Sequence, residues 1–204
     1  MTMTHTNSTN ADMKRLLEAH PCQILRKEAS IEVPAFLEGY VDVPTFLEAC
    51  KNCHNYGNLW SCPPYDFNPE DFWKRYKTLF LLASQIIFPE ELLTRTYTQE
   101  ERNAVMDLVL PLEKQKLSEE LFKKEKQHPG SISLSAGCCE TCKNGCTRPD
   151  GIPCRYPQDM RYSIESLGGN VGLTIEKLMG IHLEWMEEGR LPHHFVLVSG
   201  LLLP

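Results

Sequence analysis

The chain lacks long apolar runs, an excess of positive charge and the motifs of most nucleotide-dependent or hydrolytic enzymes. Its longest apolar run spans residues 79–83, far short of the roughly 20 residues that a membrane-spanning helix needs. The net charge of −6 offers no basic surface to nucleic acid or to an anionic membrane. No P-loop, dinucleotide-binding glycine turn, G-x-S-x-G or H-E-x-x-H occurs. The sequence therefore predicts no nucleic-acid partner and no membrane partner.

The N-terminal residues also lack the apolar core of a secretion signal. Residues 1–12 are polar, and we expect them to form a disordered tail. Since nothing directs the chain out of the cytoplasm, its thiols are expected to stay reduced. The nine cysteines are an odd number, which fully paired disulfides would not leave. We therefore predict a cytoplasmic protein whose cysteines are metal ligands or reactive thiols.

Apolar patterning predicts one α+β domain over residues 13–204. The apolar fraction of 42 % is enough for an ordinary core. Short apolar segments between turn residues predict strands, and capped segments with helical periodicity predict helices. The expected strands are 22–33, 78–88, 131–136 and 195–203, the last with 181–186 as a possible partner, and the expected helices include 13–20, 44–50, 68–76, 98–129 and 173–180. We predict a small, mostly antiparallel sheet with flanking helices and a cysteine-rich metal-binding lobe.

Two of these helices have strong start signals. Asn68 can cap a helix whose first residue is Pro69. Thr98 and Glu101 form a capping box at the start of the longest one. Pro111 lies within that helix, and we expect it to kink or divide the helix.

Eight of the nine cysteines fall into two groups along the chain. The first cysteine group is Cys50-x2-Cys53-x8-Cys62, followed by Pro63-Pro64. The second cysteine group is Cys138-Cys139-x2-Cys142-x3-Cys146-x7-Cys154. A C-x-x-C pair lets two thiolates from one turn reach the same metal, and nearby prolines and glycines bend the backbone around it. Both groups are typical of zinc or iron–sulfur coordination.

Iron–sulfur clusters account for these cysteines better than one zinc ion does. A zinc ion could take Cys50, Cys53, Cys139 and Cys142, but five cysteines would then have no role. Two 4Fe–4S clusters need about eight ligands between them. The predicted metal ligands are Cys139, Cys142, Cys146 and Cys154 for one centre and Cys50, Cys53 and Cys62 for another. We predict one or two 4Fe–4S clusters, with zinc as the alternative.

The first cysteine group supplies only three thiols, so its fourth ligand is open. Cys22, Cys138, His54, a small ligand or nothing could fill that position. If a cysteine completes the site, electron transfer is favoured. If no protein atom does, one iron could bind a substrate as a Lewis acid.

Three further side chains are candidates for contact with a cluster. Tyr56 and Trp60 lie within the first cysteine group and could shield a cluster or simply pack. A 4Fe–4S core with four thiolates carries a charge of about −2, which nearby cations could compensate. The cations beside the second cysteine group are Lys143, Arg148, Arg155 and Arg161, of which Arg155 follows a predicted ligand directly.

At these residues the chain resembles a family known as domain of unknown function 2284. The first block is Cys50-x2-Cys53-x2-Tyr56-Gly57-x2-Trp60-Ser61-Cys62-Pro63-Pro64, and the second ends with Cys154-Arg155-x-Pro157. The stretch Ser163-Ile164-Glu165-Ser166-Leu167-Gly168 is similar to a third family motif. The resemblance spans roughly residues 22–203. It implies metal binding and no particular reaction. Cys138 beside Cys139, and three residues between Cys142 and Cys146, depart from the family pattern and leave the first ligand of the second group open.

Three functions remain in view at this point. The leading expectation is an iron–sulfur protein that transfers electrons or senses redox state, with a redox partner protein. An enzyme with an open iron in its first centre is the second, and a zinc-stabilised interaction module is the third. The sequence does not indicate an oligomeric state.

Overall fold

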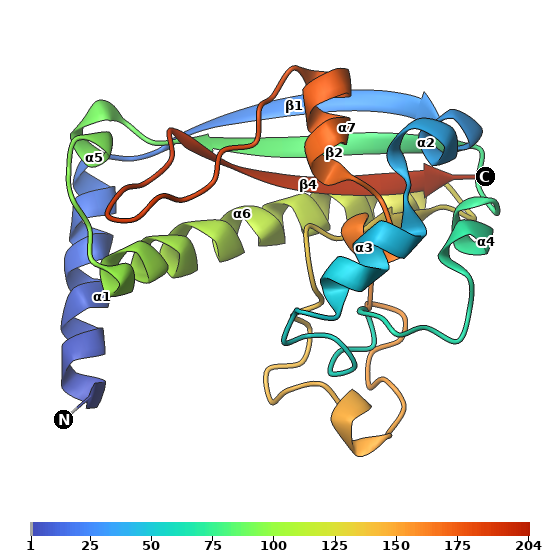
Figure 1. Cartoon of the computed structure of the whole chain (residues 1–204), viewed down its shortest axis with the longest axis horizontal. Helices are drawn as coiled ribbons and strands as arrows, with labels where there is room; N and C mark the ends of the chain where they lie inside the picture. Colours follow the sequence, from blue (N-terminus) through green and yellow to red (C-terminus); the bar gives the residue numbers. More distant parts are fainter. Residues whose placement is uncertain (1) are drawn as a thin grey trace.

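A four-stranded antiparallel sheet organises the chain (Figure 1). The computed structural model describes residues 2–204, with side chains described for residues 8–204. The strands are β1 (Gln23–Glu32), β2 (Thr78–Ile87), β3 (Ile132–Leu134) and β4 (His194–Leu203), and their spatial order is β1-β2-β4-β3. All three strand pairs are antiparallel. The α+β class and the antiparallel sheet predicted from the sequence are confirmed.

Helices and 3₁₀ turns surround this sheet. In the described part of the chain these are α1 (Thr2–Ala19), α2 (Val33–Tyr40), α3 (Val43–Cys50), α4 (Pro69–Trp73), α5 (Glu90–Leu93), α6 (Gln99–Gln127), α7 (Val171–Met179), η1 (Arg148–Asp150) and η2 (Glu165–Leu167). Figure 1 shows α6 running along one side of the sheet. None of these helices combines the length and the apolar character needed to cross a membrane.

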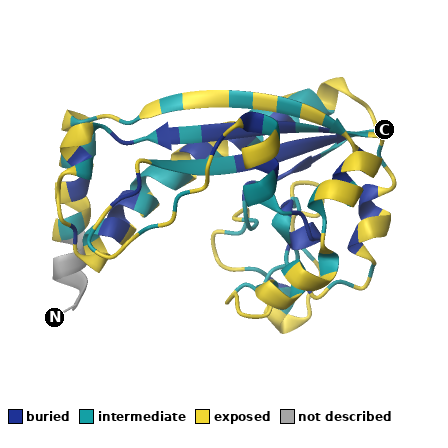
Figure 2. Cartoon of the chain, turned by 45° about the horizontal axis from the view of Figure 1, so that its top comes forward, coloured by how far each residue is buried: buried dark blue, intermediate teal, exposed yellow. Residues whose placement is uncertain are grey.

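The central strand β2 is buried on both of its faces. Leu79, Leu81 and Ala83 pack into the main apolar core with α2, α4 and α7. Leu82 points the other way and packs with Leu117 of α6. Because successive strand residues point to opposite faces, a strand covered on both sides has to be continuously apolar. Figure 2 shows the buried residues concentrated in the sheet and in the helices against it.

The pairing of the last strand differs from the sequence prediction. β4 lies between β2 and β3, with Leu79 opposite Leu202 and Leu134 opposite Gly200. The prediction that residues 181–186 pair with it was wrong. That segment contains Glu184 and the exposed Trp185, whereas β2 offers apolar side chains on both faces, so burial favours β2 as the partner.

The long helix α6 begins as predicted and is not divided. Thr98 and Glu101 form the capping box at its start. Pro111 lies inside the helix, yet the helix continues to Gln127, so of the two expected effects, a kink or a division, the division does not occur. Proline in a helix interior costs about 3 kcal/mol. Buried residues on both sides of it, among them Val105 and Leu121, offset that cost by packing.

The N-terminal helix is longer than expected. We predicted a helix over residues 13–20, and α1 spans Thr2–Ala19, so it includes most of the segment expected to be a tail. Met13 anchors α1, because it is buried in an apolar cluster with Phe88, Tyr97 and Val105. The division of the chain at residue 13 stays a prediction.

Two similar stretches between β1 and the first cysteine group both form helices. They are α2 and α3, and each has proline as its second residue. Only the second was expected to be helical. Phe36 of α2 is fully buried and packs at a tilt against Trp73 of α4, with ring centroids 5.2 Å apart. This contact fixes the start of the segment that leads to the first cysteine group.

Apart from Cys50, which ends α3, the cysteines of both groups lie in mostly irregular segments on one side of the sheet. Residues 51–67 and 135–163 come together below the sheet in Figure 1, next to the C-terminal half of α6. A parallel bridge between Ser135 and Ser163 closes the second segment. The fold therefore places cysteines that are far apart in the sequence in one region.

Candidate metal centre

Helix α3 delivers the first cysteine of the site. Asp42 caps the helix, since its Oδ1 accepts a hydrogen bond of 3.1 Å from the backbone N–H of Thr45. Pro44 fits the first turn, where no backbone donor is needed. Cys50 is the last residue of α3, as predicted.

Beyond α3 the backbone turns repeatedly and gathers the first cysteine group. The N–H of Cys53 donates to the carbonyl of Cys50 at 3.0 Å, and the N–H of Tyr56 donates to the carbonyl of Cys53 at 3.0 Å. The N–H of Cys62 likewise donates to the carbonyl of Leu59 at 3.0 Å. Each bond closes a tight turn, so the three cysteines lie on a curled segment.

Electrostatic coupling places Cys138 with this group. Burial raises the pKa of the Cys62 thiol to about 11, a hydrogen bond from Ser61 opposes the rise, and the charges of Cys138, Cys53 and Cys50 add to it. Burial also raises the pKa of Cys50, followed by the charge of Cys53. Such couplings act over short distances. We group these four cysteines as a candidate set, called here the first thiol set, although Cys138 also lines the cavity described below.

Cys138 reaches the first thiol set at a bend after β3. Gly137 has φ of +72°, a conformation that glycine adopts without a steric cost. The hydroxyl of Ser135 donates to the carbonyl of Gly137 at 2.7 Å. Lys114 of α6 donates from Nζ to the carbonyl of Cys138 at 2.6 Å. Burial raises the pKa of Cys138, and the charge of Lys114 opposes that rise.

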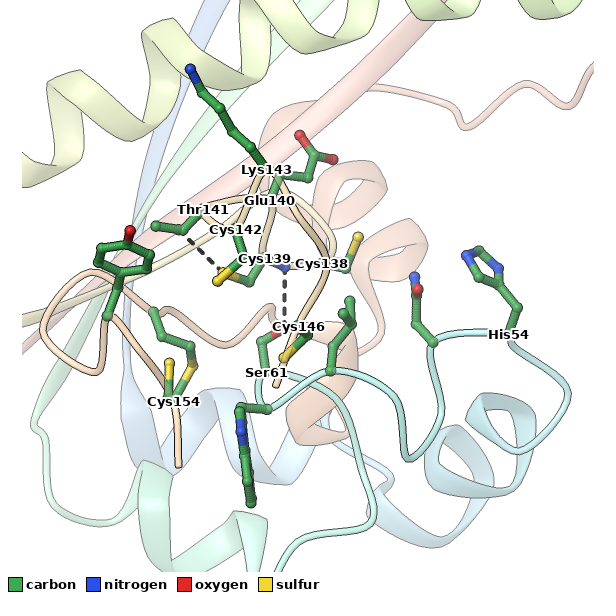
Figure 3. Close-up of a pocket in the computed structure, with 16 residues that line it drawn as sticks. His54, Ser61, Cys138, Cys139, Glu140, Thr141, Cys142, Lys143, Cys146 and Cys154 are labelled. Carbon is green, nitrogen blue, oxygen red and sulfur yellow. Dashed lines mark hydrogen bonds between the residues drawn. The ribbon is translucent and has the colours of Figure 1, made fainter. Parts of the chain in front are cut away.

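The remaining four clustered cysteines form the second thiol set: Cys139, Cys142, Cys146 and Cys154. Burial raises the pKa of Cys154, a backbone hydrogen bond from Tyr156 opposes the rise, and the charges of the other three thiols add to it. All four line one cavity of about 490 Å³, which Cys138 lines as well (Figure 3). The second thiol set therefore surrounds a space that opens between the two irregular segments.

The cysteine doublet supplies one residue to each set. In Figure 3 the sulfur of Cys138 lies on the opposite side of the backbone from that of Cys139. The doublet, which departs from the family pattern, is thus the place where the two sets meet.

Arg148 joins the two segments through backbone contacts. Its Nη1 donates to the carbonyl of Leu59 at 2.6 Å and also to that of Cys62, and its Nη2 donates to the carbonyl of Pro64. Its guanidinium lies 5.3 Å from the ring centroid of Trp60. One cation from the second segment therefore holds the first segment in its curled form.

The side chains predicted to contact a cluster are only partly placed near the thiols. Trp60 lines the cavity and donates from Nε1 to the carbonyl of Ile152 at 3.1 Å. Arg155 is exposed and donates to the carbonyl of Gly145 at 2.9 Å. Tyr56 is half-buried in the first segment. Contact of these three residues with a cofactor stays a prediction.

Two of the residues considered as a fourth ligand, Cys22 and His54, lie outside the first thiol set. Cys22 packs in the apolar cluster around Met13, and burial raises its pKa to about 11. His54 is exposed and lines the cavity of the second thiol set (Figure 3). Cys138 is the candidate whose charge contributes to the raised pKa of Cys62, and its role as a fourth ligand stays a prediction.

Sequence reasoning missed two polar side chains beside the thiols. Ser61 is 1 % exposed and lies next to Cys62. Burial raises the pKa of Glu165, whose Oε2 is buried and has no hydrogen-bond partner within residues 8–204. The charge of Glu165 in turn contributes to the raised pKa of Cys50. Both residues stand in the family motifs, which was the available signal.

The chemistry of the donors fits an iron–sulfur cluster or zinc. All nine cysteines are free thiols, and soft thiolates select zinc and iron–sulfur clusters. A single tetrahedral zinc would hold its thiolate sulfurs about 4 Å apart. Within the part of the chain that the structure describes, no three or more His, Cys, Asp or Glu side chains are arranged to hold a single ion. Each thiol set contains four cysteines, which is the number of thiolates that bind a 4Fe–4S cluster.

These features define a cysteine-rich α+β protein with two sets of free thiols. Comparison with protein families supplies a more specific assignment. Residues 38–203 match the family described as predicted metal-binding protein (DUF2284), and the chain belongs to that family. The resemblance noted in the sequence is thereby confirmed. No curated protein and no solved structure matches the chain.

Proposed function

We propose that the chain is an iron–sulfur protein with two 4Fe–4S centres, which transfers electrons or senses redox state in the cytoplasm. The observation that carries the proposal is the gathering of eight free thiols from two distant segments of the chain into one region, where five of them line a single cavity. Cys50, Cys53, Cys62 and Cys138 would hold the first centre. Cys139, Cys142, Cys146 and Cys154 would hold the second. With four thiolates each, both centres would be fully ligated, which favours electron transfer over substrate binding at an open iron.

The surroundings of the thiols support this assignment. Burial raises the pKa of Cys50, Cys62 and Cys138, and a bound metal would hold them as thiolates. Lys114 and Arg148 bind the backbone beside the cysteines and bring positive charge to centres that would each carry about −2. The second centre would border a solvent-accessible cavity, where a redox partner protein could exchange electrons with it.

Analysis of anaerobically purified protein tests the proposal. We expect a brown protein with about eight iron and about eight sulfide per chain. One or two zinc ions per chain without sulfide would instead establish the zinc-stabilised module, and the iron–sulfur proposal would fail.

Single substitutions test the two thiol sets. Cys142→Ser and Cys138→Ser should each remove about half of the iron, because each takes one ligand from a different centre. Cys22→Ser is the matched control, since it makes the same atomic change at a cysteine outside both sets, and it should leave the iron content unchanged. Full iron content in Cys138→Ser would indicate a first centre with a non-cysteine position, as the open-iron enzyme requires.

A further inference from the structure

One buried hydroxyl contacts both thiol sets. Ser61 is 1 % exposed and precedes Cys62. Its Oγ accepts a hydrogen bond of 3.1 Å from the backbone N–H of Cys139. The same Oγ lies 3.8 Å from Sγ of Cys62. A ligand candidate of each proposed centre is therefore bound by a single side chain.

The direction of the second bond follows from the first. A serine hydroxyl has one hydrogen and accepts through its oxygen. Because the oxygen of Ser61 already accepts from the backbone of Cys139, its own hydrogen is available to the sulfur of Cys62. A metal-bound thiolate has no hydrogen to donate and can only accept. In the loaded protein the bond therefore runs from the hydroxyl of Ser61 to the sulfur of Cys62.

A hydrogen bond and aromatic packing also hold the backbone of Ser61 in place. Tyr65 donates from its hydroxyl to the carbonyl of Ser61 at 2.8 Å. Tyr65 stacks on Phe67, with ring centroids 4.8 Å apart, and both pack against the main core. The hydroxyl is thus held between the two sets by a rigid part of the fold.

We propose that Ser61 is a positioning residue that couples the two centres, by donating to a ligand sulfur of the first and holding the backbone of a ligand of the second. The inference rests on the proposed iron–sulfur function. Hydrogen bonds to ligand sulfurs are among the factors that set cluster reduction potentials. Donation from Ser61 withdraws charge from the sulfur of Cys62, stabilises the reduced state and raises the potential of the first centre.

Potentiometric titration of the loaded protein tests this role. In Ser61→Ala the potential of the first centre should shift to more negative values. Two variants show which reduction potential belongs to which centre. Cys53→Ser lacks a ligand of the first centre, and Cys146→Ser lacks a ligand of the second. Ser61→Thr keeps the hydroxyl and should restore the wild-type potential. The backbone amide of Cys139 should exchange roughly two- to tenfold faster in Ser61→Ala, because it loses its acceptor.

Two control variants separate this role from a general structural effect. Thr141 places its hydroxyl 3.3 Å from Sγ of Cys139, so Thr141→Val should shift the potential of the second centre alone. Ser199 is also fully buried, and its hydroxyl has no hydrogen-bond partner among the described residues. Ser199→Ala removes the same atom in the sheet and should leave both potentials unchanged.

The outcomes that overturn the inference differ from those that overturn the proposed function. Wild-type protein without iron and sulfide overturns the proposed function, and the inference falls with it. Ser61→Ala with full iron content and an unchanged first potential overturns the inference alone. If Ser61→Ala does not load, Ser61→Thr decides: loading with the wild-type potential supports the role, and loading with a shifted potential overturns it.

Discussion

At the scale of single residues, Lys114 is a cation that contacts the backbone of a cysteine in the first thiol set. It lies on α6, and its side chain is only 13 % exposed. Its Nζ donates to the carbonyl of Cys138 at 2.6 Å and to Glu140 at 2.5 Å. A half-buried ammonium with two acceptors costs free energy to remove, because the acceptors are left unpaired.

Replacing Lys114 by methionine should weaken the first centre more than the second. The change keeps most of the side-chain volume but leaves the carbonyl of Cys138 without its donor, at an expected cost of about 1–3 kcal/mol in unfolding free energy. Iron content and urea unfolding measure the effect. Lys126→Met, at an exposed position on the same helix, is the control. Equal iron loss from both centres would contradict the assignment of Lys114 to the first.

At the scale of secondary-structure elements, the packing of η2 on α3 orients the first thiol set. The N–H of Asp42 donates to the carbonyl of Gly168 at 2.9 Å. Gly168 has φ of +85°, and a Cβ atom there would lie 2.7 Å from Cγ2 and 2.8 Å from Cα of Val43. Only glycine fits between the two elements. Since α3 ends at Cys50 and η2 contains Glu165, this contact determines how those two side chains face each other.

Gly168→Ala should therefore destabilise the protein more than the same change at another left-handed glycine. Gly180 has φ of +63° with open space around the position of a Cβ atom, so Gly180→Ala should cost about 1 kcal/mol from backbone strain alone. Gly168→Ala adds a clash with backbone atoms and should cost about 2 kcal/mol or more. Thermal unfolding compares the two. Equal losses would show that η2 moves freely against α3.

The end of α6 is tied to the second segment by an ion pair that depends on pH. Glu125 accepts from Arg161 at 2.5 Å and from the backbone and hydroxyl of Ser133 at 2.8 Å and 2.6 Å. Burial alone would raise the pKa of Glu125, but the hydrogen bonds from Arg161 and Ser133 lower it overall from 4.5. The stabilisation is therefore fully present above about pH 4.5 and is lost as the pH falls through the lower folded-state value.

Glu125→Gln should remove this pH dependence. At neutral pH we expect a loss of about 1–3 kcal/mol in unfolding free energy, since Arg161 loses its charged partner. At about pH 3 the difference from wild type should shrink, because the carboxyl of the wild type is then becoming protonated. Urea unfolding at both pH values measures it. The control is Glu119→Gln, an exposed position on α6. A difference that grows in acid would contradict the assigned sign.

Local signals in the sequence predicted elements better than the contacts between them. Asn68 and Thr98 cap α4 and α6 as expected, because a cap involves only residues within one turn. The partner of β4 was missed, since it depends on which apolar strand covers it across the sheet. The place of Cys138 could not be predicted for a related reason: it depends on the bend after β3 and on Lys114, which are far apart in sequence.

At the scale of the whole molecule, an apolar sheet carries a cysteine lobe that has little core of its own. Residues 137–161 include exposed Ile152 and Tyr156 and are held mainly by hydrogen bonds such as that of Thr147 to the carbonyl of Pro153 at 3.0 Å. β2, in contrast, is buried on both faces. The free energy of metal binding should therefore act mainly on the lobe.

Removal of metal should loosen the lobe while the sheet stays protected. After chelation, amide hydrogen exchange in residues 137–161 and 51–64 should become faster, and exchange in β2 should change little. Mass spectrometry of peptide fragments measures both regions in one experiment. Equal protection of the lobe with and without metal would mean that the metal contributes little to its folding.

Protein synthesis starts at the N-terminus. The position of Cys138 therefore also determines the order in which the two thiol sets form in a newly made chain. The second thiol set lies within one short stretch and is complete as soon as Cys154 is synthesised. The first thiol set needs Cys138 beside Cys62, and that approach depends on Lys114 of α6 and on Arg148. In the proposed protein the first centre would therefore be loaded after the second, once α6 has docked on the sheet.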